Sequence, residues 1–362
     1  MSDKTSKIEV QRSSNFEILR ILLILFVIVL HYNDSSRHGA FLFIESATTI
    51  NRLFLYCMES FALCAVNAFL CLSGFFLSRK NEVSTSKIIH LFTVLFAFNL
   101  FTYLLSAVPH HTLSLAGLLR CFIPRNYYAN LYTVVFVLSP FLNLVTRNFD
   151  IRNYKRFLIL LLSLFAIIPT IIDYILPTFF SLKLSTVSTI SLYGNGRGFT
   201  LINFILLYYI GGFIARIDIK TKLKPLAVYI TSSLFVLFMM CANRKLAISY
   251  CNIFVVIQAA SLVACFKNIK VQSTFVNVIA KSVWGVFCIH GFFLAIYCKF
   301  FPYDLSQNAL SLVFHFSVCI VSVFIVSILW DKICSFALNP IENLLKKIRF
   351  LNKKISVKED NP

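Results

Sequence analysis

The chain has very little charge. Only 14% of its 362 residues are Asp, Glu, Lys or Arg, and only 15 are acidic, whereas a soluble domain of this length carries about 25% charged residues. Hydrophobic residues make up 58% of the chain, aromatic residues 15%, and the mean hydropathy is +0.80. These values exclude an ordinary soluble enzyme. They predict an all-α protein, a polytopic bundle of membrane-spanning helices.

Several common functional motifs are missing. The 11 cysteines form no CxxC pair, so the sequence supports neither a disulfide framework nor a zinc site. No Walker loop, dinucleotide fingerprint or HExxH motif occurs, which argues against nucleotide hydrolysis and zinc proteolysis. We therefore expect no metal and no permanently bound cofactor. The net charge of +19 suits cytoplasmic loops that orient membrane helices, so we expect no nucleic-acid partner.

Long apolar runs dominate the rest of the chain. Ten of them are long enough, or nearly so, to cross a hydrocarbon core. Their limits are 16–33, 53–78, 86–108, 129–146, 157–177, 199–216, 225–242, 248–266, 282–299 and 309–331. Most of the 34 basic residues fall on one side if both termini are cytoplasmic, as the positive-inside rule requires. We expect a membrane domain over 1–335 and a short basic cytoplasmic tail over 336–362.

The first apolar run carries Arg20 and His31 at its two ends. Eleven residues of α-helix make about three turns, which places the two side chains on one face, about 16 Å apart along the axis. Titratable groups inside a membrane span are costly and therefore indicate function. A neutral histidine is a suitable base for a hydroxyl nucleophile. The planar guanidinium group of an arginine suits the phosphate oxygens of a phosphate-bearing donor. The alternative is that Arg20 only follows the positive-inside rule and His31 only caps the helix.

Five short patterns follow one another along nearly the whole chain, most of them combining glycine or a polar residue with aromatic neighbours. They are Glu17 to Arg20 followed by His31, Asn67 to Leu77 (NAFLCLSGFFL), Tyr132 to Asn143 (ending SPFLN), Phe199 to Gly212 (ending YYIGG) and Trp284 to His290 (WGVFCIH). In this order they resemble the helices of the acyltransferase-3 family of integral membrane O-acyltransferases.

The resemblance implies acyl-CoA-dependent O-acetylation of a surface or lipid-linked glycan, in a multi-pass protein of a bacterial inner membrane. It implies that His31 is the catalytic histidine and that Arg20 is its partner, contacting the acetyl-CoA donor. Arg79 would bind the same donor on the cytoplasmic side. His290 would contact the donor or support acyl transfer, although a buried structural histidine is an equal alternative. Direct transfer and an acyl-enzyme both remain open, as does the oligomeric state.

The outer loops contain the candidates for binding the acceptor, which are Arg120, Arg125, Tyr127 and Arg197. Arginine binds phosphate and aromatic rings stack on sugars, but aromatic residues also anchor helices at membrane interfaces. The sequence departs from the family at Tyr127 and at Asn203, where relatives often carry tryptophan, and this leaves the acceptor open. The alternative function is a transporter or flippase of a lipid-linked oligosaccharide, which would show paired Gly/Pro-broken helices in two halves. We find none.

Overall fold

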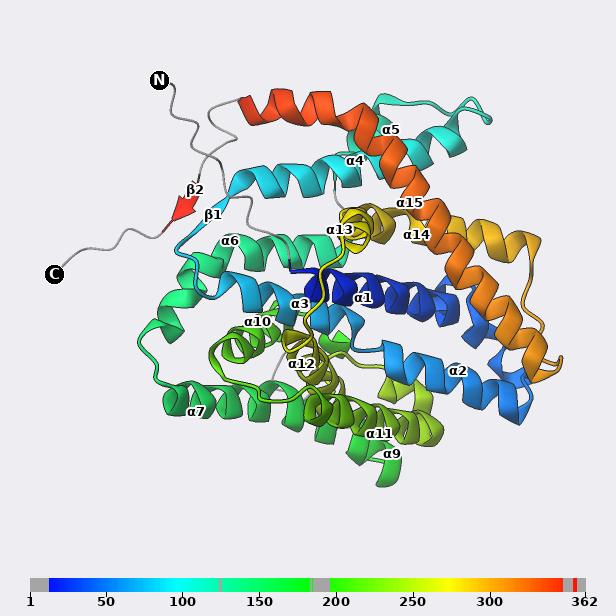
Figure 1. The fold of residues 1–362 in the computed structure, drawn as a ribbon. Helices are drawn as coiled ribbons and strands as arrows, with labels where there is room; N and C mark the ends of the chain where they lie inside the picture. Colours follow the sequence, from blue (N-terminus) through cyan, green and yellow to red (C-terminus); the bar gives the residue numbers. More distant parts are fainter. Residues whose placement is uncertain (1–12, 124–125, 183, 185–195, 348–353, 357–362) are drawn as a thin grey trace, which may run out of the picture.

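The computed structural model describes residues 13–123, 126–182, 184, 196–347 and 354–356. These residues form helices almost throughout, as Figure 1 shows. The helices are α1 (Ser14–Asn33), α2 (Thr49–Ala62), α3 (Ala65–Leu77), α4 (Thr85–Ala107), α5 (Leu115–Arg120), α6 (Tyr127–Arg147), α7 (Ile151–Leu162), α8 (Ile168–Thr170), α9 (Leu176–Phe179), α10 (Leu201–Arg216), α11 (Leu223–Ala247), α12 (Ile253–Lys267), α13 (Thr274–Ala280), α14 (Val283–Phe300) and α15 (Ala309–Lys347).

Eight helical segments of the described chain are long and apolar enough to cross a membrane, and two of them join several helices. These two are Thr49–Leu77, which contains α2 and α3, and Ile151–Phe179, which contains α7 to α9. The helices α10 and α12 are apolar but shorter. The eight segments and these two shorter helices coincide with the ten apolar runs of the sequence. The predicted all-α polytopic bundle is confirmed, whereas the number of crossings stays a prediction.

The centre of the bundle is built from α1, α3, α10 and α12, and α1 runs through its middle (Figure 1). Two glycines allow α3 and α10 to approach closely. A Cβ added at Gly74 would lie 2.0 Å from the carbonyl oxygen of Tyr208, and one at Gly211 would lie 1.8 Å from that of Cys71. Small residues at helix interfaces are the usual means of tight packing in membranes. The Ser-Gly and Gly-Gly patterns of the sequence therefore serve packing.

Side-chain caps fix the starts of the helices beside the site. Asn126 accepts a hydrogen bond from the backbone of Ala129 at the start of α6, and Thr200 accepts one from Asn203 at the start of α10. Such caps replace the hydrogen bonds that the first turn of a helix lacks. They also fix the first turn of α6, which carries Tyr127, and the approach to α10, which carries Arg197.

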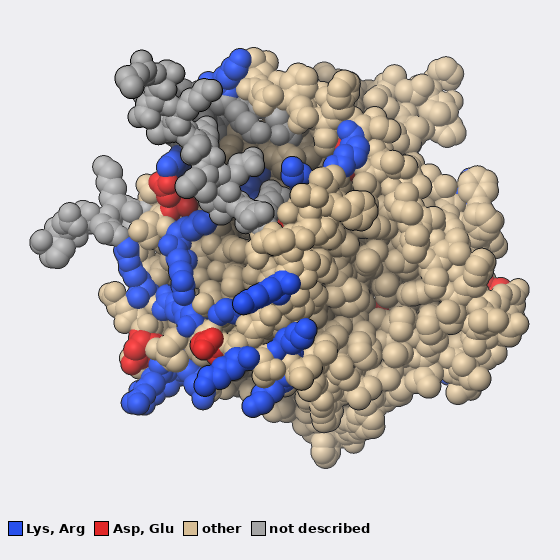
Figure 2. Space-filling model, in the orientation of Figure 1, with Lys and Arg blue, Asp and Glu red and all other residues tan. Residues whose placement is uncertain are grey.

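Lys and Arg gather at one end of the molecule. Figure 2 shows them at the left of the face in view, where Figure 1 places β1 (Glu82–Ser84) and α7. We call this the basic end. A one-sided distribution of this kind is what the positive-inside rule requires of a cytoplasmic face. The orientation in the membrane itself stays a prediction.

The C-terminal segment returns to the basic end. The helix α15 continues past the predicted domain boundary between residues 335 and 336. Strand β2 (Lys354–Ser356) then pairs antiparallel with β1, and Lys354 forms an ion pair with Glu82 at 2.5 Å. This two-stranded ribbon connects the described part of the tail to the loop that follows α3.

Candidate active site

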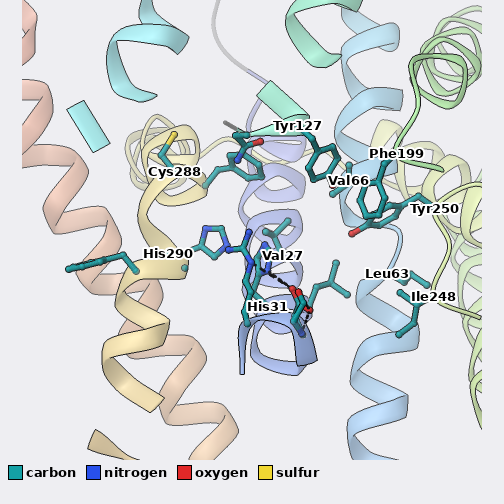
Figure 3. A pocket seen from close by; sticks show the side chains of 18 of the residues that line it. Val27, His31, Leu63, Val66, Tyr127, Phe199, Ile248, Tyr250, Cys288 and His290 are labelled. Carbon is teal, nitrogen blue, oxygen red and sulfur yellow. Dashed lines mark hydrogen bonds and ion pairs between the residues drawn. The ribbon is translucent and has the colours of Figure 1, made fainter. Parts of the chain in front are cut away.

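A cavity of about 630 Å³ lies between α1, α2–α3, α4 and α14. Figure 3 shows side chains that line it, and it lies at the end of α1 that is farther from β1 and α7 in Figure 1. This volume lies within the usual range for small-molecule sites, about 300–1,000 Å³. The cavity brings together four of the residues that the sequence predicts for the site: His31, Tyr127, Arg197 and His290. We call it the histidine pocket. Its other charged or amide side chains are Asp34, Arg37, Glu59, Asn99 and Asn126.

His31 lies in the last turn of α1 and is accompanied by a fixed carboxylate. Its Nδ1 is 3.8 Å from Oδ2 of Asp34, and the Asp34 carboxylate accepts hydrogen bonds from the backbone and hydroxyl of Ser36. Burial works to raise the pKa of Asp34, but the interactions with His31 and Ser36 outweigh it and hold the pKa at about 2. At this distance His31 Nδ1 has no hydrogen-bond partner among the described residues, but the negative charge beside it favours the tautomer with a proton on Nδ1. The lone pair of Nε2 is then available as a base.

His290 lies beside His31, on α14. The centroids of the two rings are 4.8 Å apart and the ring planes are inclined by 34°. Figure 3 labels both side chains in the pocket. The Nδ1 of His290 is 3.0 Å from the carbonyl oxygen of Val286, which places a proton on Nδ1 and leaves Nε2 as an acceptor. This Nε2 is buried and has no hydrogen-bond partner among the described residues. A buried polar atom of this kind needs an explanation, and a bound substrate would provide one.

A network of hydrogen bonds builds the opposite wall of the pocket. Asn67 donates to the carbonyl of Tyr250 at 2.6 Å, and the backbone of Tyr250 donates to the carbonyl of Arg197 at 2.8 Å. Arg197 has the left-handed φ of 54°, in a turn that Asn203 fixes through a hydrogen bond to the carbonyl of Gly198. Asn67 and Asn203, which the sequence singles out, therefore position the wall from behind it.

Sequence reasoning missed three charged residues of the pocket: Asp34, Arg37 and Glu59. Glu59 is only 4% exposed, and its carboxylate accepts a hydrogen bond from Asn33 at 2.9 Å. The signal for Glu59 was present, because it is an acidic residue inside an apolar run, and such residues indicate function. Asp34 and Arg37 lie in the turn after α1, where a charged residue is unremarkable. Only the fold shows that they face the histidines.

Arg20 lies at the basic end, away from the pocket. Its guanidinium forms an ion pair with Glu17 at 2.5 Å and is 5.5 Å from the centre of the Phe76 ring. The side chain is one-third exposed. Since Arg20 and His31 are eleven residues apart on one helix, about 16 Å separates them along the axis. The histidine pocket reaches down α1 as far as Val27, about 10 Å from Arg20 on the same measure.

Arg79 follows α3 at the same end. It donates to the carbonyl of Ala215, at the end of α10, over 3.2 Å, and it borders a shallow hollow of about 210 Å³. Lys267, at the end of α12, donates to the same carbonyl at 3.4 Å and lies 5.8 Å from the centre of the Phe75 ring. The ends of α3, α10 and α12 thus bring Arg79 and Lys267 together. The rings of Phe75 and Phe76 pack against each other between Lys267 and Arg20. Sequence reasoning did not single out Lys267.

Of the remaining two predicted acceptor residues, one lies outside the histidine pocket and the other is not among the described residues. Arg120 borders a neighbouring hollow of about 330 Å³ together with Asn99, and Asn99 also lines the histidine pocket. Arg125 lies outside the described residues. Of the predicted acceptor residues, Arg197 therefore lines the histidine pocket, and Arg120 lines the hollow that shares Asn99 with it.

Comparison with known proteins agrees with this architecture. The acyltransferase domain of the acyltransferase-3 family matches residues 13–331. The match includes all the described helices except the last part of α15. No curated protein and no solved structure matches the chain.

Proposed function

Because the chain belongs to the acyltransferase-3 family and is a membrane acyltransferase, we propose that it transfers an acetyl group from cytosolic acetyl-CoA to a hydroxyl of a glycan outside the cytoplasm. We place this activity in a bacterial inner membrane. The observation that carries the proposal is the His31–Asp34 pair, which lines a pocket with charged and amide side chains at the end of α1 away from the basic end. A base on one side and cations on the other suit a reaction whose two substrates arrive from opposite sides.

Acetyl-CoA would bind with its phosphates at the basic end. Arg20 offers a planar fork that suits phosphate oxygens, and Arg79 and Lys267 add positive charge within one cluster of helix ends. The extended arm of coenzyme A would follow α1 toward Val27 and bring the thioester to His31. In this arrangement His290 lies at the acyl end of the donor and not at its phosphates, since it contacts His31.

The transfer step uses His31 as a general base. Its Nε2 takes the proton of the acceptor hydroxyl while the hydroxyl oxygen attacks the thioester carbonyl carbon. The carbon–sulfur bond then breaks, the proton on Nε2 passes to the leaving sulfur, and an O-acetyl ester and free coenzyme A remain. Asp34 stabilises the imidazolium that forms in between, because it stays ionised at any physiological pH. General-base catalysis by a positioned side chain contributes roughly 10²–10⁴-fold to the rate.

The acceptor sugar would lie against the wall formed by Tyr127, Phe199 and Tyr250. The rings of Tyr127 and Phe199 meet edge to face at 4.7 Å, and Phe199 meets Tyr250 in the same way at 5.0 Å. Aromatic faces of this kind suit the apolar faces of sugar rings, and Arg197 adds a charged hydrogen-bond donor beside them.

Mass spectrometry of surface glycan tests the proposal. Cells that carry the intact gene should show glycan heavier by one acetyl group per modified sugar than cells that lack it. Cells that express His31→Ala at normal membrane levels should match the deletion. Unaltered glycan together with accumulated lipid-linked precursor in the deletion would instead support the transporter. Acetylated glycan from His31→Ala cells would remove His31 from the mechanism.

A further inference from the structure

A second cavity adjoins the histidine pocket. It has a volume of about 710 Å³ and shares His31, Arg37 and Gly291 with the first. The other residues that line it are His38, Phe43, Leu294, Ala295, Cys298, Lys299, Pro302 and Tyr303. We call it the side chamber. The proposed function leaves this chamber without a role.

The side chamber combines an apolar wall with cations. Phe43, Leu294, Ala295 and Pro302 supply the wall, whereas Arg37, His38 and Lys299 supply charge or potential charge. Among the described residues that line the chamber none is acidic. An apolar wall and a cluster of cations match an amphiphile with an anionic head group. A free sugar would leave the wall uncovered, and a neutral lipid would leave the cations without a counter-charge.

Arg37 stands where the two cavities meet. Its Nε is 3.7 Å from the Asp34 carboxylate, while its Nη1 lies against the backbone of α14, because Gly291 has no Cβ to displace it. The side chain is 57% exposed. Arg37 therefore touches the carboxylate of the histidine pocket and still presents donors toward the side chamber. An anion bound there would lie next to the reacting histidine.

The chamber also lies at the end of the bundle where a lipid could enter from the side. It follows the second half of α14, whose neighbouring residues Ile296, Phe300 and Phe301 expose 40%, 72% and 57% of their surfaces. Large exposed apolar side chains on a spanning helix indicate a surface that is in contact with the membrane. The apolar wall is thus continuous with a surface that faces lipid.

We propose that the side chamber binds the lipid carrier of the acceptor, a phosphate or diphosphate on a polyisoprenoid chain. The phosphate would contact Arg37, His38 and Lys299, and the first isoprenoid units would cover the apolar wall. The attached sugar would then pass Arg37 into the histidine pocket. This inference rests on the proposed function, since it names the class of acceptor. The same chemistry occurs in phospholipids, so the test must separate the two sources.

Binding to the purified full-length protein in detergent gives the first test. Undecaprenyl phosphate is the probe, and undecaprenol, inorganic phosphate and phosphatidylglycerol are the comparisons. We expect undecaprenyl phosphate to bind at least about tenfold more tightly than each comparison, a difference of about 1.4 kcal/mol. Equal binding of phosphatidylglycerol would show a phospholipid site and overturn the proposal. Equal binding of undecaprenol would remove the phosphate contact and overturn it as well.

A matched pair of variants tests whether undecaprenyl phosphate binds in the side chamber. Ala295→Trp fills the chamber from an exposed position on α14, whereas Ile296→Trp adds the same bulk at the next residue, which does not line the chamber. Ala295→Trp should weaken binding of undecaprenyl phosphate about tenfold or more, and Ile296→Trp should leave it within about twofold. Lys299→Glu should weaken binding further than Lys299→Arg. If the two tryptophan variants behave alike, the probe binds elsewhere.

Acetyl transfer separates this inference from the proposed function. Ala295→Trp should lower transfer to a polyprenyl-diphosphate-linked oligosaccharide but leave transfer to the same oligosaccharide without its lipid unchanged. If both transfers fall together, the side chamber does not select the lipid. If the wild-type protein acetylates neither acceptor but binds undecaprenyl phosphate as described, the proposed function fails while the chamber keeps its ligand.

Discussion

The rings of His31 and His290 lie 4.8 Å apart, although the two residues are 259 positions apart in the chain. Neither position identifies the other in the sequence, because one ends the first helix and the other lies within α14. Their contact sets the centre of the histidine pocket. The two rings differ in their partners: an aspartate faces Nδ1 of His31, and a backbone carbonyl faces Nδ1 of His290.

This difference predicts unequal effects of removing the two rings. His31→Ala should lower acetyl transfer about a hundredfold or more, because the general base is lost. His290→Asn should lower it about tenfold or less, since an asparagine amide can still bond the Val286 carbonyl while the ring contact with His31 is lost. Initial rates with purified protein measure both effects. The exposed His110 gives the control, as His110→Ala removes a histidine that lines neither the histidine pocket nor the side chamber. Equal losses for both site variants would contradict the assigned roles.

The acidic side of the pH profile tests Asp34. Its folded-state pKa of about 2 lies below its usual value, so the ionised form stabilises the fold above pH of about 4 and this contribution disappears only as the pH falls toward 2. Asp34 therefore does not titrate in the working range. Asp34→Asn should lower the rate and move the acid limb of the pH–rate profile to lower pH, because the imidazolium of His31 loses its anionic neighbour.

The comparison variant for Asp34 is Asp304→Asn, which changes an exposed carboxylate in the loop between α14 and α15. It should leave the acid limb where it is. An acid limb that stays in place in Asp34→Asn would show that the carboxylate does not act on His31.

Donor binding should depend on the shape of the Arg20 side chain. Arg20→Lys keeps the charge but loses the planar fork, so the KM for acetyl-CoA should rise about tenfold while kcat changes little. Arg20→Ala should raise the KM further. Steady-state kinetics with varied acetyl-CoA and saturating acceptor measure the change. Arg152→Lys is the matched control, since Arg152 is exposed on α7 at the same end. A fall in kcat at unchanged KM would place Arg20 in the chemistry instead of the donor site.

The close contact between α3 and α10 predicts a stability effect. Gly211→Ala would put a methyl group 1.8 Å from the Cys71 carbonyl oxygen, and two helix backbones must separate to admit it. Overpacking of this kind costs typically 1–3 kcal/mol. Thermal unfolding in detergent should show a clear fall in Tm. Gly291→Ala meets only the flexible end of Arg37, at 2.9 Å, and should change Tm much less. Similar Tm values for both would argue that the helices are looser than the structure shows.

The sequence predicts the helices well because apolar runs of this length have few other solutions. It also places His31 and Arg20 on one face, since both lie on a single regular helix. It does not predict that His290 contacts His31 or that Arg197 lines the same pocket, because both depend on how separate helices pack. Asp34, Arg37 and Glu59 show the same limit. Their chemistry is evident from residue type, but their direction is set by the turn after α1 and by the approach of α2.

The side chamber lies further beyond the reach of sequence reasoning. Its wall comes from η2 (Ala40–Ser46), from the second half of α14 and from Pro302 in the loop after α14. Each residue of that wall would serve equally well in ordinary packing. The cations Arg37 and Lys299 are 262 positions apart. Only the arrangement of the helices brings them to one opening.

The pairing of β1 with β2 has a consequence for biosynthesis. The strand that completes this ribbon is made 272 residues after the glutamate to which Lys354 is paired. While the ribosome is still producing the later helices, the loop that carries Arg79 already exists at the membrane surface, with its backbone donors and acceptors facing water. It gains its partner strand only after α15 has been made. A protein truncated after α15 would therefore keep every helix and still leave that loop in its nascent state.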